Sequence, residues 1–373
     1  MRIGIDARCL EWNIGGPARY LTNMLRLWPQ MTKKHRYVLF FQRSIPNADF
    51  LVNEQFEHVL IRGPRFLKTR RILGEQLLMP FAIRKSNLDV FFAPWYSAPL
   101  INCGVKTVIG AWDITCNTHP HHYTLFDRIS FGLFMPPSCK KAEGLLTCSA
   151  FDAGQIEKYY GIPAERICVV PYAADEKFKP VDDPEEIAAF RRKYGLPERY
   201  ILSMGIIIPR RNVDVIIDAF TEIHETFSNV GLVVIGRNLT MPFIDIAGRM
   251  KPLIDKGKGF YWPRASEDDI VNFYCGAWYY ICTSTVDGES LMLKEAMKCG
   301  TPVITSPLLK ETVGGNAVIL DDPTDRKQTG EILQKVILDS ELRNRFSRAS
   351  GKWIQTLSWE RVAEESLKFI ESR

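Results

Sequence analysis

An acidic, hydroxyl-rich segment near residue 290 stands directly before a stretch with a helical apolar pattern. It reads Thr283-Ser284-Thr285-Val286-Asp287-Gly288-Glu289-Ser290, and a helix is expected over 291–299. The free N–H groups and the positive dipole end at the start of such a helix form a site for a diphosphate. The alternative is that Ser290 only caps the helix. Asp287 on the loop and Glu295 one turn into the helix could accept hydrogen bonds from the hydroxyls of a sugar and a ribose, although Glu295 could equally be a solvated helix residue.

Two adjacent cations, Arg210 and Arg211, stand at the start of another expected helix. The helix dipole disfavours positive charge there, so the pair makes better sense if an anion lies between them. Arg211 is therefore predicted to clamp a phosphate, and the alternative is a solvated pair.

A glycine pair near the amino terminus, Gly15-Gly16, permits close backbone approach to a ligand, although any tight turn would use the same residues. The pattern is neither GxGxxG nor a P-loop. A dinucleotide cofactor and an NTPase phosphate cradle therefore have no support.

Apolar strands that alternate with amphipathic helices must position these residues. A short strand at Ile3–Ile5 precedes a helix with a core-facing stripe made of Leu21, Met24, Leu25 and Trp28. In the second half, strands are expected at 200–204, 232–235, 260–261, 278–282 and 302–305, and helices at 213–220, 243–253, from 268, and 291–299. The pattern predicts the α/β class, with two doubly wound Rossmann-like domains that face each other across a cleft. Ligands of parallel sheets bind at the carboxyl ends of the strands, where the turns above lie.

Length and composition agree with two globular domains. The chain has 373 residues, of which 46% are hydrophobic and 24% charged, so disorder and coiled coils are excluded. The linker-like segment 179–184 places the boundary, giving domains 1–180 and 181–355 and a C-terminal helix 356–373 that crosses back to the first domain. No apolar run is long enough for a spanning helix, charge interrupts the opening segment, and the cysteines are scattered. We expect a cytoplasmic protein that could lie peripheral to the membrane.

Positive charge gathers in the front half, where residues 1–180 carry 23 Lys and Arg against 15 Asp and Glu. A cluster made of Arg62, Arg65, Lys68, Arg70 and Arg71 precedes the apolar run 77–81. This segment could rest on the inner membrane face or meet an acidic acceptor, and the alternative is a solvated helix face. No recognition module accompanies the charge, so nucleic acid is not an expected partner.

Several ordered motifs resemble one enzyme family along nearly the whole chain. They are MRIGIDARCL with GGPARY, LLTCSAFDAGQI, PYAAD, SMGIIIPRRN, DGESLMLKEAMKCGTPVI, ETVGGNAVILDDPTD and SWERVAEESLKFI. These pieces are similar to the retaining glycosyltransferases of the GT-B fold, family 4 (glycosyl transferases group 1).

The resemblance implies a function and a set of site residues. Members transfer a sugar from a nucleotide donor to a glycan or lipid-linked acceptor, with retention of anomeric configuration and with no cofactor or obligatory metal. Glu295 would bind the ribose, Arg210 and Arg211 the diphosphate, and Gly15 and Gly16 would approach the diphosphate from the first domain. The backbone amides around the start of the late helix would bind the phosphate and the donor sugar, through Ser290, Leu291 and Met292.

Two positions depart from the family pattern. The first acidic residue of the signature is Asp287, one methylene shorter than the usual glutamate, so its contact with the sugar could shift or pass through water. The family commonly has a histidine directly before the aspartate aligned with Asp113, and this chain has Trp112 there. Trp112 could stack on a sugar ring, or it could mark lost activity.

Three nearby histidines offer a substitute for the missing one. His119, His121 and His122 follow within nine residues of Asp113, and one could take over the role; alternatively the three could bind a metal. The expected catalytic residues are Asp287, Asp113 and His119.

Two other functions are compatible with the same motifs. The departures at Asp287 and Trp112 would fit a catalytically silent nucleotide-sugar-binding partner protein. A sugar-nucleotide epimerase on the same two-domain scaffold would isomerise the donor with no acceptor present.

Overall fold

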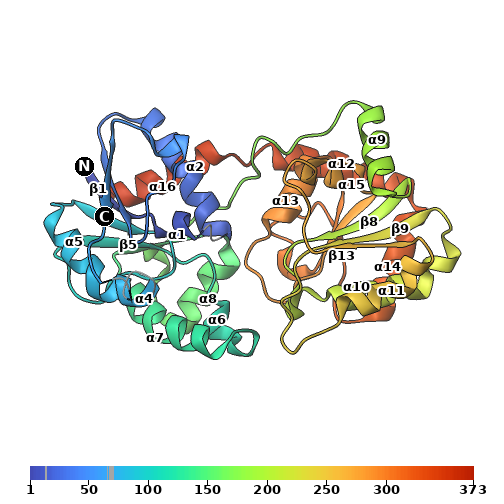
Figure 1. Cartoon of the computed structure of the whole chain (residues 1–373), viewed down its shortest axis with the longest axis horizontal. Coiled ribbons are helices and arrows are strands. Elements are labelled where there is room, and N and C mark those ends of the chain that lie inside the picture. Colours follow the sequence, from blue (N-terminus) through green and yellow to red (C-terminus); the bar gives the residue numbers. More distant parts are fainter. Residues whose placement is uncertain (13–14, 65, 67–70) are drawn as a thin grey trace. The chain divides into compact units, whose positions relative to one another are not determined.

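A computed structural model describes residues 1–12, 15–64, 66 and 71–373 (Figure 1). The chain forms two compact units, which we call unit 1 (Met1–Tyr172 with Ser358–Arg373) and unit 2 (Ala173–Leu357). The sequence placed the boundaries at 180/181 and 355/356, which lie eight residues after the first boundary between the units and two residues before the second. Among the described helices, none has both the length and the apolar content that crossing a bilayer requires.

Unit 1 is built on a parallel sheet with seven strands in the described residues, in the order β3-β2-β1-β4-β5-β6-β7. The strands are β1 (Arg2–Asp6), β2 (Arg36–Phe41), β3 (Phe56–Leu60), β4 (Val90–Ala93), β5 (Lys106–Gly110), β6 (Gly144–Thr147) and β7 (Ile167–Val169). The helical segments are α1 (Arg8–Glu11), α2 (Gly15–Met31), η1 (Asp49–Leu51), α4 (Arg71–Leu73), η2 (Gly74–Leu78), α5 (Met79–Lys85), α6 (Thr115–Thr118), η3 (Pro120–His122), α7 (Leu125–Lys141), α8 (Ala150–Tyr160), η4 (Ala164–Arg166) and α16 (Trp359–Glu371).

Helices cover both faces of the unit 1 sheet because its strands are apolar on both sides. Side chains from α5, α7 and α8 pack with one set of strand residues, which includes Phe40, Phe91 and Ile109. On the other face, the expected stripe of α2 is buried, and Trp28 of that stripe stacks on Tyr37 of β2. The C-terminal helix α16 joins this layer, since the Nε1–H of Trp28 donates to the Ala363 carbonyl at 2.9 Å.

Unit 2 repeats the plan with six parallel strands in the described chain, in the order β10-β9-β8-β11-β12-β13. They are β8 (Arg199–Met204), β9 (Val230–Ile235), β10 (Gly259–Trp262), β11 (Tyr279–Cys282), β12 (Val303–Thr305) and β13 (Val318–Ile319). The helical segments are α9 (Pro184–Tyr194), η5 (Pro209–Arg211), α10 (Val213–Ile223), η6 (His224–Thr226), α11 (Ile246–Asp255), α12 (Ile270–Gly276), α13 (Leu291–Lys298), η7 (Pro307–Leu309), α14 (Arg326–Leu338) and α15 (Ser340–Ile354).

Alternation along each strand divides the unit 2 core into two layers. Ile201 packs with α10, α11 and α14, whereas its neighbour Leu202 packs with α9, α12 and α13 on the opposite face. The prediction of parallel sheets covered on both sides is therefore confirmed for both units.

The order of the strands places the functional turns. In unit 2 the chain leaves β8 for β9 on one side and returns to β11 on the other, so a crevice opens at the carboxyl ends of β8 and β11. In unit 1 the equivalent point lies between β1 and β4. The residues expected to bind the donor follow β8 and β11, and the glycine pair follows β1.

One expected helix begins later than its apolar pattern suggested. The pattern placed the helix from Phe243, but α11 begins at Ile246, and the Phe243 side chain is 74% exposed. The side chain of Asp245 accepts a hydrogen bond from the Gly248 N–H at 2.9 Å, so a cap at Asp245 fixes the helix start.

Candidate functional site

Two loops of unit 2 are hydrogen-bonded to each other at the β8–β11 crevice. The Thr285 N–H donates to the Arg210 carbonyl at 2.8 Å, and the Asn212 amide donates to the Thr283 carbonyl at 2.8 Å. Asn212 lies in the left-handed region, with φ 49°, between the turn η5 and helix α10. The loop with the two arginines and the loop with the acidic segment therefore form one structural unit.

The side chains of the two arginines bond to the backbone of these loops. Arg210 donates from Nη1 to the Val286 carbonyl at 2.5 Å, and Arg211 donates from Nη1 to the Ile206 carbonyl at 3.2 Å. The Arg211 side chain is only 16% exposed. Its Nε–H is buried and has no hydrogen-bond partner among the described residues. A buried donor without a partner is costly, so this group is well placed to bind an anion.

The side chain of Arg211 reaches the first turn of α13, where Ser290 lies. Its Nη1 is 3.8 Å from the Met292 sulfur. Gly205, at the end of β8, makes this contact possible: a Cβ there would lie 2.5 Å from Arg211 Nη1 and 2.4 Å from the Met292 sulfur, and its φ of +131° also favours glycine.

The start of α13, where the sequence predicts a diphosphate site, has no side-chain cap in the described structure. Ser290 is the N-cap residue and is buried, but its hydroxyl makes no capping hydrogen bond. The first backbone N–H groups of α13, from Leu291 and Met292, therefore have no side-chain partner from Ser290. The structure places the Arg211 side chain against the Met292 side chain, in the first turn of the helix whose start Ser290, Leu291 and Met292 form.

The two carboxylates of the signature have different surroundings. Asp287 lies 3.5 Å from Arg210 and 3.9 Å from Arg211, so it shares the crevice with both cations. Glu295 is 4% exposed, and its Oε2 accepts a hydrogen bond from the Tyr274 hydroxyl at 3.0 Å. Burial, followed by the charge of Glu295, raises the pKa of Tyr274, which therefore stays a hydrogen-bond donor. Glu295 is a buried, oriented carboxylate rather than a solvated helix residue.

A buried ion pair at the same helix start was not predicted from the sequence. Lys294 pairs with Glu289, and their side chains are 1% and 4% exposed. In the sequence, each residue alone resembles an ordinary surface charge. Only their separation by five residues, with one before the helix and the other inside it, could have indicated an ion pair. It fixes the loop between Asp287 and α13.

Unit 1 contains the remaining expected residues. Gly15 has φ +30°, and a Cβ added there would meet no atom within 4 Å, whereas a Cβ at Gly16 would lie 3.5 Å from the Tyr172 ring. Asp113 follows β5 and accepts hydrogen bonds from Tyr96 and Thr115.

His119 is not a hydrogen-bond partner of Asp113; its Nδ1 lies 2.9 Å from the Thr118 hydroxyl. The ring of His121 lies 6.1 Å from that of His119. The side chain of His122 lies outside the described part of the chain. Among the described residues, no group of three His, Cys, Asp or Glu side chains is arranged to hold a metal ion.

Trp112 belongs to the core of unit 1. It is 3% exposed, its Nε1–H donates to the Pro94 carbonyl at 2.6 Å, and its ring packs on Tyr20 and Tyr172 at 4.5 and 5.2 Å. A ring enclosed in this way has no free face for a sugar, so the stacking role considered for Trp112 is wrong.

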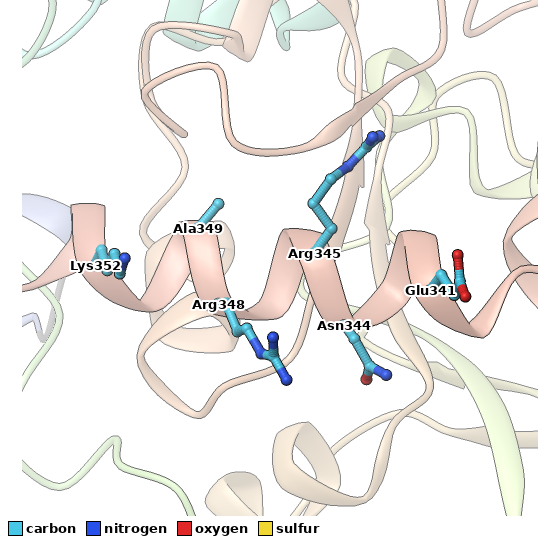
Figure 2. A pocket seen from close by; sticks show the side chains of 6 residues that line it. All are labelled: Glu341, Asn344, Arg345, Arg348, Ala349 and Lys352. Carbon is cyan, nitrogen blue, oxygen red and sulfur yellow. The ribbon is translucent and has the colours of Figure 1, made fainter.

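A second hollow lies on α15 and is a weaker candidate. Figure 2 shows its lining, which comes from that one helix: Glu341, Asn344, Arg345, Arg348, Ala349 and Lys352. The charged side chains point in different directions along the helix rather than toward one point. The crevice at β8 and β11 is therefore the candidate site.

Two family models match consecutive parts of the chain. Residues 14–178 match the model "Glycosyltransferase Family 4", and residues 186–353 match "Glycosyl transferases group 1". Between them they cover most of both units.

Curated relatives are distant in sequence. The chain is 25% identical to O-antigen chain mannosyltransferase B of Escherichia coli over 83% of this chain and 80% of the relative. It is 22% identical to mannosylfructose-phosphate synthase of Agrobacterium fabrum over 69% of this chain, and the match spans 58% of that protein. The match to the serotype-specific mannosyltransferase WbdA of Escherichia coli spans only 29% of that relative's length.

Solved structures resemble the whole chain. WaaG, a glycosyltransferase involved in lipopolysaccharide biosynthesis, superposes with a TM-score of 0.75 at 16% identity over 99% of both chains. HepE from Anabaena, solved with UDP and glucose, gives a TM-score of 0.74 at 15% identity over the full length of both chains. At these identities the likeness establishes the fold.

Proposed function

Because the chain belongs to the GT-B glycosyltransferases of family 4 and group 1, we propose that it moves a sugar from a nucleoside diphosphate donor to a saccharide or lipid-linked acceptor in glycan biosynthesis. The transfer retains the anomeric configuration and needs no obligatory metal. The relatives named above include O-antigen chain mannosyltransferase B and a serotype-specific mannosyltransferase, which supports a role in surface glycan assembly.

The observation that carries the proposal is the guanidinium of Arg211 beside the uncapped start of α13. Negative charge accumulates on the diphosphate as the bond to the sugar breaks. A buried cation with an unpaired N–H, together with free helix amides, stabilises that charge without reorganising in the transition state. Fixed cations of this kind supply what a metal would otherwise supply. Asp287 and Glu295 then serve as acceptors for hydroxyls of the donor.

The first experiment measures sugar transfer and donor hydrolysis with a panel of nucleotide sugars. Nucleotide-activated mannose and glucose are tested first. One relative is named a mannosyltransferase, and HepE was solved with UDP and glucose. Arg211→Ala and Glu295→Ala are expected to be inactive, whereas Arg192→Ala, which removes an exposed cation of unit 2, is expected to behave as wild type. Wild-type turnover in both site variants would refute the assignment of the site.

The same panel separates the alternatives. Tight nucleotide binding with no turnover for any acceptor would favour the silent partner protein. Isomerisation of the donor without an acceptor, followed by NMR, would favour the epimerase.

The proposal includes a peripheral contact with the cytoplasmic face of a membrane. Of the cluster that suggested it, residues 65, 68 and 70 lie outside the described part of the chain. Arg71 turns inward, where its guanidinium bonds Trp95 and Ser97, so it does not face lipid. Arg62 is exposed, and Leu77 and Phe81 have side chains that are 46% and 62% exposed.

Helix α7 adds a more regular surface to this contact. Leu125, Ile129 and Leu133, one turn apart, have side chains that are 71%, 57% and 61% exposed, and we call them the α7 stripe. Arg128, Lys140 and Lys141 are exposed on the same helix. Apolar side chains flanked by cations complement an anionic lipid surface.

Sedimentation with vesicles tests this contact. Wild type is expected to bind vesicles that contain phosphatidylglycerol and not vesicles of phosphatidylcholine alone. The double variant Ile129→Asp, Leu133→Asp is expected to stay in solution, and Leu338→Asp, a 73% exposed leucine of α14, serves as the control. Equal binding by the double variant and the control would exclude the α7 stripe.

A further inference from the structure

Tyr96 has an unusual backbone conformation directly after β4. Its φ is +65°, in the left-handed region, which an aromatic residue seldom occupies. The Ser97 N–H donates to the Trp95 carbonyl at 2.8 Å, a bond between residues two apart. Tyr96 is thus the central residue of a γ-turn of the rare, strained hand. Such strain persists only where the surroundings hold it.

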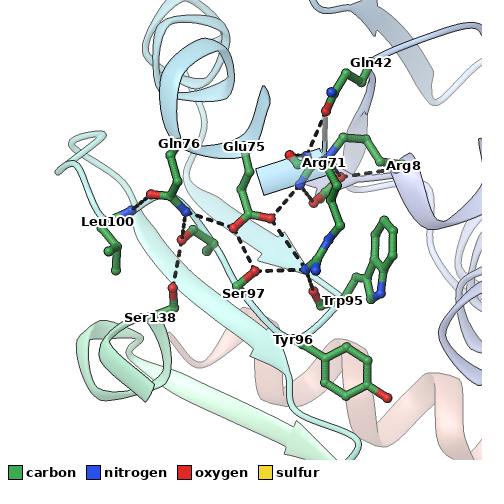
Figure 3. A network of polar contacts seen from close by, with 12 residues as sticks. Arg8, Gln42, Arg71, Glu75, Gln76, Trp95, Tyr96, Ser97, Leu100 and Ser138 are labelled. Atoms are coloured by element: carbon green, nitrogen blue, oxygen red, sulfur yellow. Dashed lines mark hydrogen bonds and ion pairs between the residues drawn. The ribbon is translucent and has the colours of Figure 1, made fainter. Parts of the chain in front are cut away.

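Arg71 holds this turn from behind. Its Nη2 donates to the Trp95 carbonyl at 2.7 Å and to the Ser97 hydroxyl at 2.9 Å, and its guanidinium lies 4.1 Å from the centre of the Trp95 ring. Glu75 accepts the Ser97 hydroxyl at 2.7 Å. Figure 3 shows these contacts as one connected network on one side of the turn.

The network itself is anchored in the core. Arg8 and Glu75 are fully buried and form an ion pair at 2.8 Å, and Arg8 also pairs with Asp6 of β1 at 2.7 Å. The buried pair of Arg8 and Glu75 therefore supports the side chains that hold the strained turn. In Figure 3 the ring of Tyr96 points away from this network.

The ring of Tyr96 leads to Asp113. The Tyr96 hydroxyl donates to Asp113 Oδ2 at 3.1 Å, while Oδ1 accepts the N–H of Thr115 at 3.0 Å and its hydroxyl at 2.6 Å. Burial, with the charge of Asp113, raises the pKa of Tyr96, which keeps the phenol protonated as a donor. Within the described chain, Asp113 bonds to Tyr96 and Thr115 and to no lysine or arginine.

The geometry leaves the carboxylate able to bind one more donor. An ionised carboxylate offers about four acceptor positions, and the contacts from Tyr96 and Thr115 use three of them. The remaining position is on Oδ2, the oxygen that Tyr96 holds. Asp113 is partly exposed, so a group from solution can reach it.

We propose that Asp113 binds a hydroxyl of the acceptor, other than the hydroxyl that reacts, and that Tyr96 is the positioning residue that fixes the carboxylate for this contact. This assignment rests on the proposed transfer reaction. It predicts that the part of the acceptor that contacts Asp113 is a neutral polyol. The strained turn and its buried network keep Tyr96 in place. In the reaction the acceptor oxygen bonds to the sugar, the donor C–O bond breaks, and the acceptor proton leaves on the diphosphate; Asp113 takes no proton.

The experiment compares Tyr96→Phe with wild type in the full-length protein, using the best donor and acceptor from the panel. The variant is expected to lose roughly ten-fold in kcat/KM for the acceptor, the size expected for one hydrogen bond to a charged group. The donor KM and the slow hydrolysis of donor by water are expected to stay unchanged. Tyr37→Phe, another buried tyrosine of unit 1, is the matched control and is expected to match wild type.

A double-mutant cycle and a second variant complete the test. In an Asp113→Asn background, Tyr96→Phe is expected to have no further effect, because it acts through Asp113. Thr115→Val removes another hydrogen bond to Asp113 and replaces Tyr96→Phe in the test if that variant does not fold. It is expected to lower the ratio of transfer to hydrolysis as well.

The outcomes separate this assignment from the proposed function. Transfer and hydrolysis that fall in equal proportion, or a Tyr96→Phe variant that transfers like wild type, would overturn the assignment alone. A wild-type protein that consumes no donor with any acceptor would contradict the proposed function, and the assignment with it.

Discussion

Gly205 shows how one residue type shapes the candidate site. It occupies the space between β8 and the side chains of Arg211 and Met292, and its φ of +131° is unfavourable for other residues. Gly205→Ala is therefore expected to displace Arg211 and to lower the free energy of unfolding by about 1–3 kcal/mol. The donor KM should rise with it. Enzyme assays and urea denaturation measure the two effects.

A glycine without such constraints provides the control. A Cβ at Gly351, inside α15, would meet no atom within 4 Å. Gly351→Ala is expected to leave the donor KM unchanged and to stabilise the helix slightly. If Gly205→Ala binds the donor as well as this control does, Arg211 is not held by the glycine.

At the scale of residues, the sequence showed groups that are close along the chain. Asp287, Ser290 and Glu295 stand in one short window, so their convergence at a helix start was predictable. The turn at Tyr96 was not predictable, because its conformation depends on Arg71 and on the hydrogen bond that the Tyr96 N–H donates to the Gly110 carbonyl. The contact between Lys294 and Glu289 was missed because the sequence does not show that either residue is buried. Their burial is what makes this ion pair unusual.

Among the elements, the π-helical segment η2 is the one that the buried network requires. It carries Glu75 into the core beside Arg8, which lies 67 residues earlier in the chain. Glu75→Gln would remove the negative charge that pairs with Arg8 and Arg71 in the protein interior, where no water replaces it. The expected loss in the free energy of unfolding is about 3–5 kcal/mol, measured by urea denaturation.

An exposed ion pair is the natural comparison for this prediction. Asp255→Asn breaks the pair with Lys251 on the outer face of α11, where both side chains are more than half exposed. Its stability is expected to match wild type because solvent screens the pair. Equal stabilities for Glu75→Gln and Asp255→Asn would mean that the network does not brace unit 1.

The sequence was most informative about whole elements. Strands buried on both faces appear as continuous apolar runs, so β8, β9 and β11 were recognisable. Helix starts were less certain because caps decide them, as Asp245 does for α11. η2 was not foreseen, since its geometry follows from contacts with distant segments.

For the molecule as a whole, the residues assigned to the donor and those assigned to the acceptor belong mainly to different units. Arg211 and Glu295 lie in unit 2, and Asp113 lies in unit 1. Asp113→Asn is therefore expected to have lower but measurable transfer activity, while its Kd for a nucleoside diphosphate, measured by calorimetry, stays within about two-fold of wild type. Arg211→Ala should weaken that Kd by about ten-fold or more. A large loss of nucleotide binding in Asp113→Asn would contradict this division.

The placement of α16 has a consequence for biosynthesis. This helix is the final one in the described chain, yet its Trp359, Val362 and Ile370 are buried within unit 1, beside helix α2. A ribosome releases every residue of unit 2 before it releases α16. Unit 1 therefore waits for a helix that is encoded after unit 2, whereas unit 2 can finish folding while α16 is still being translated.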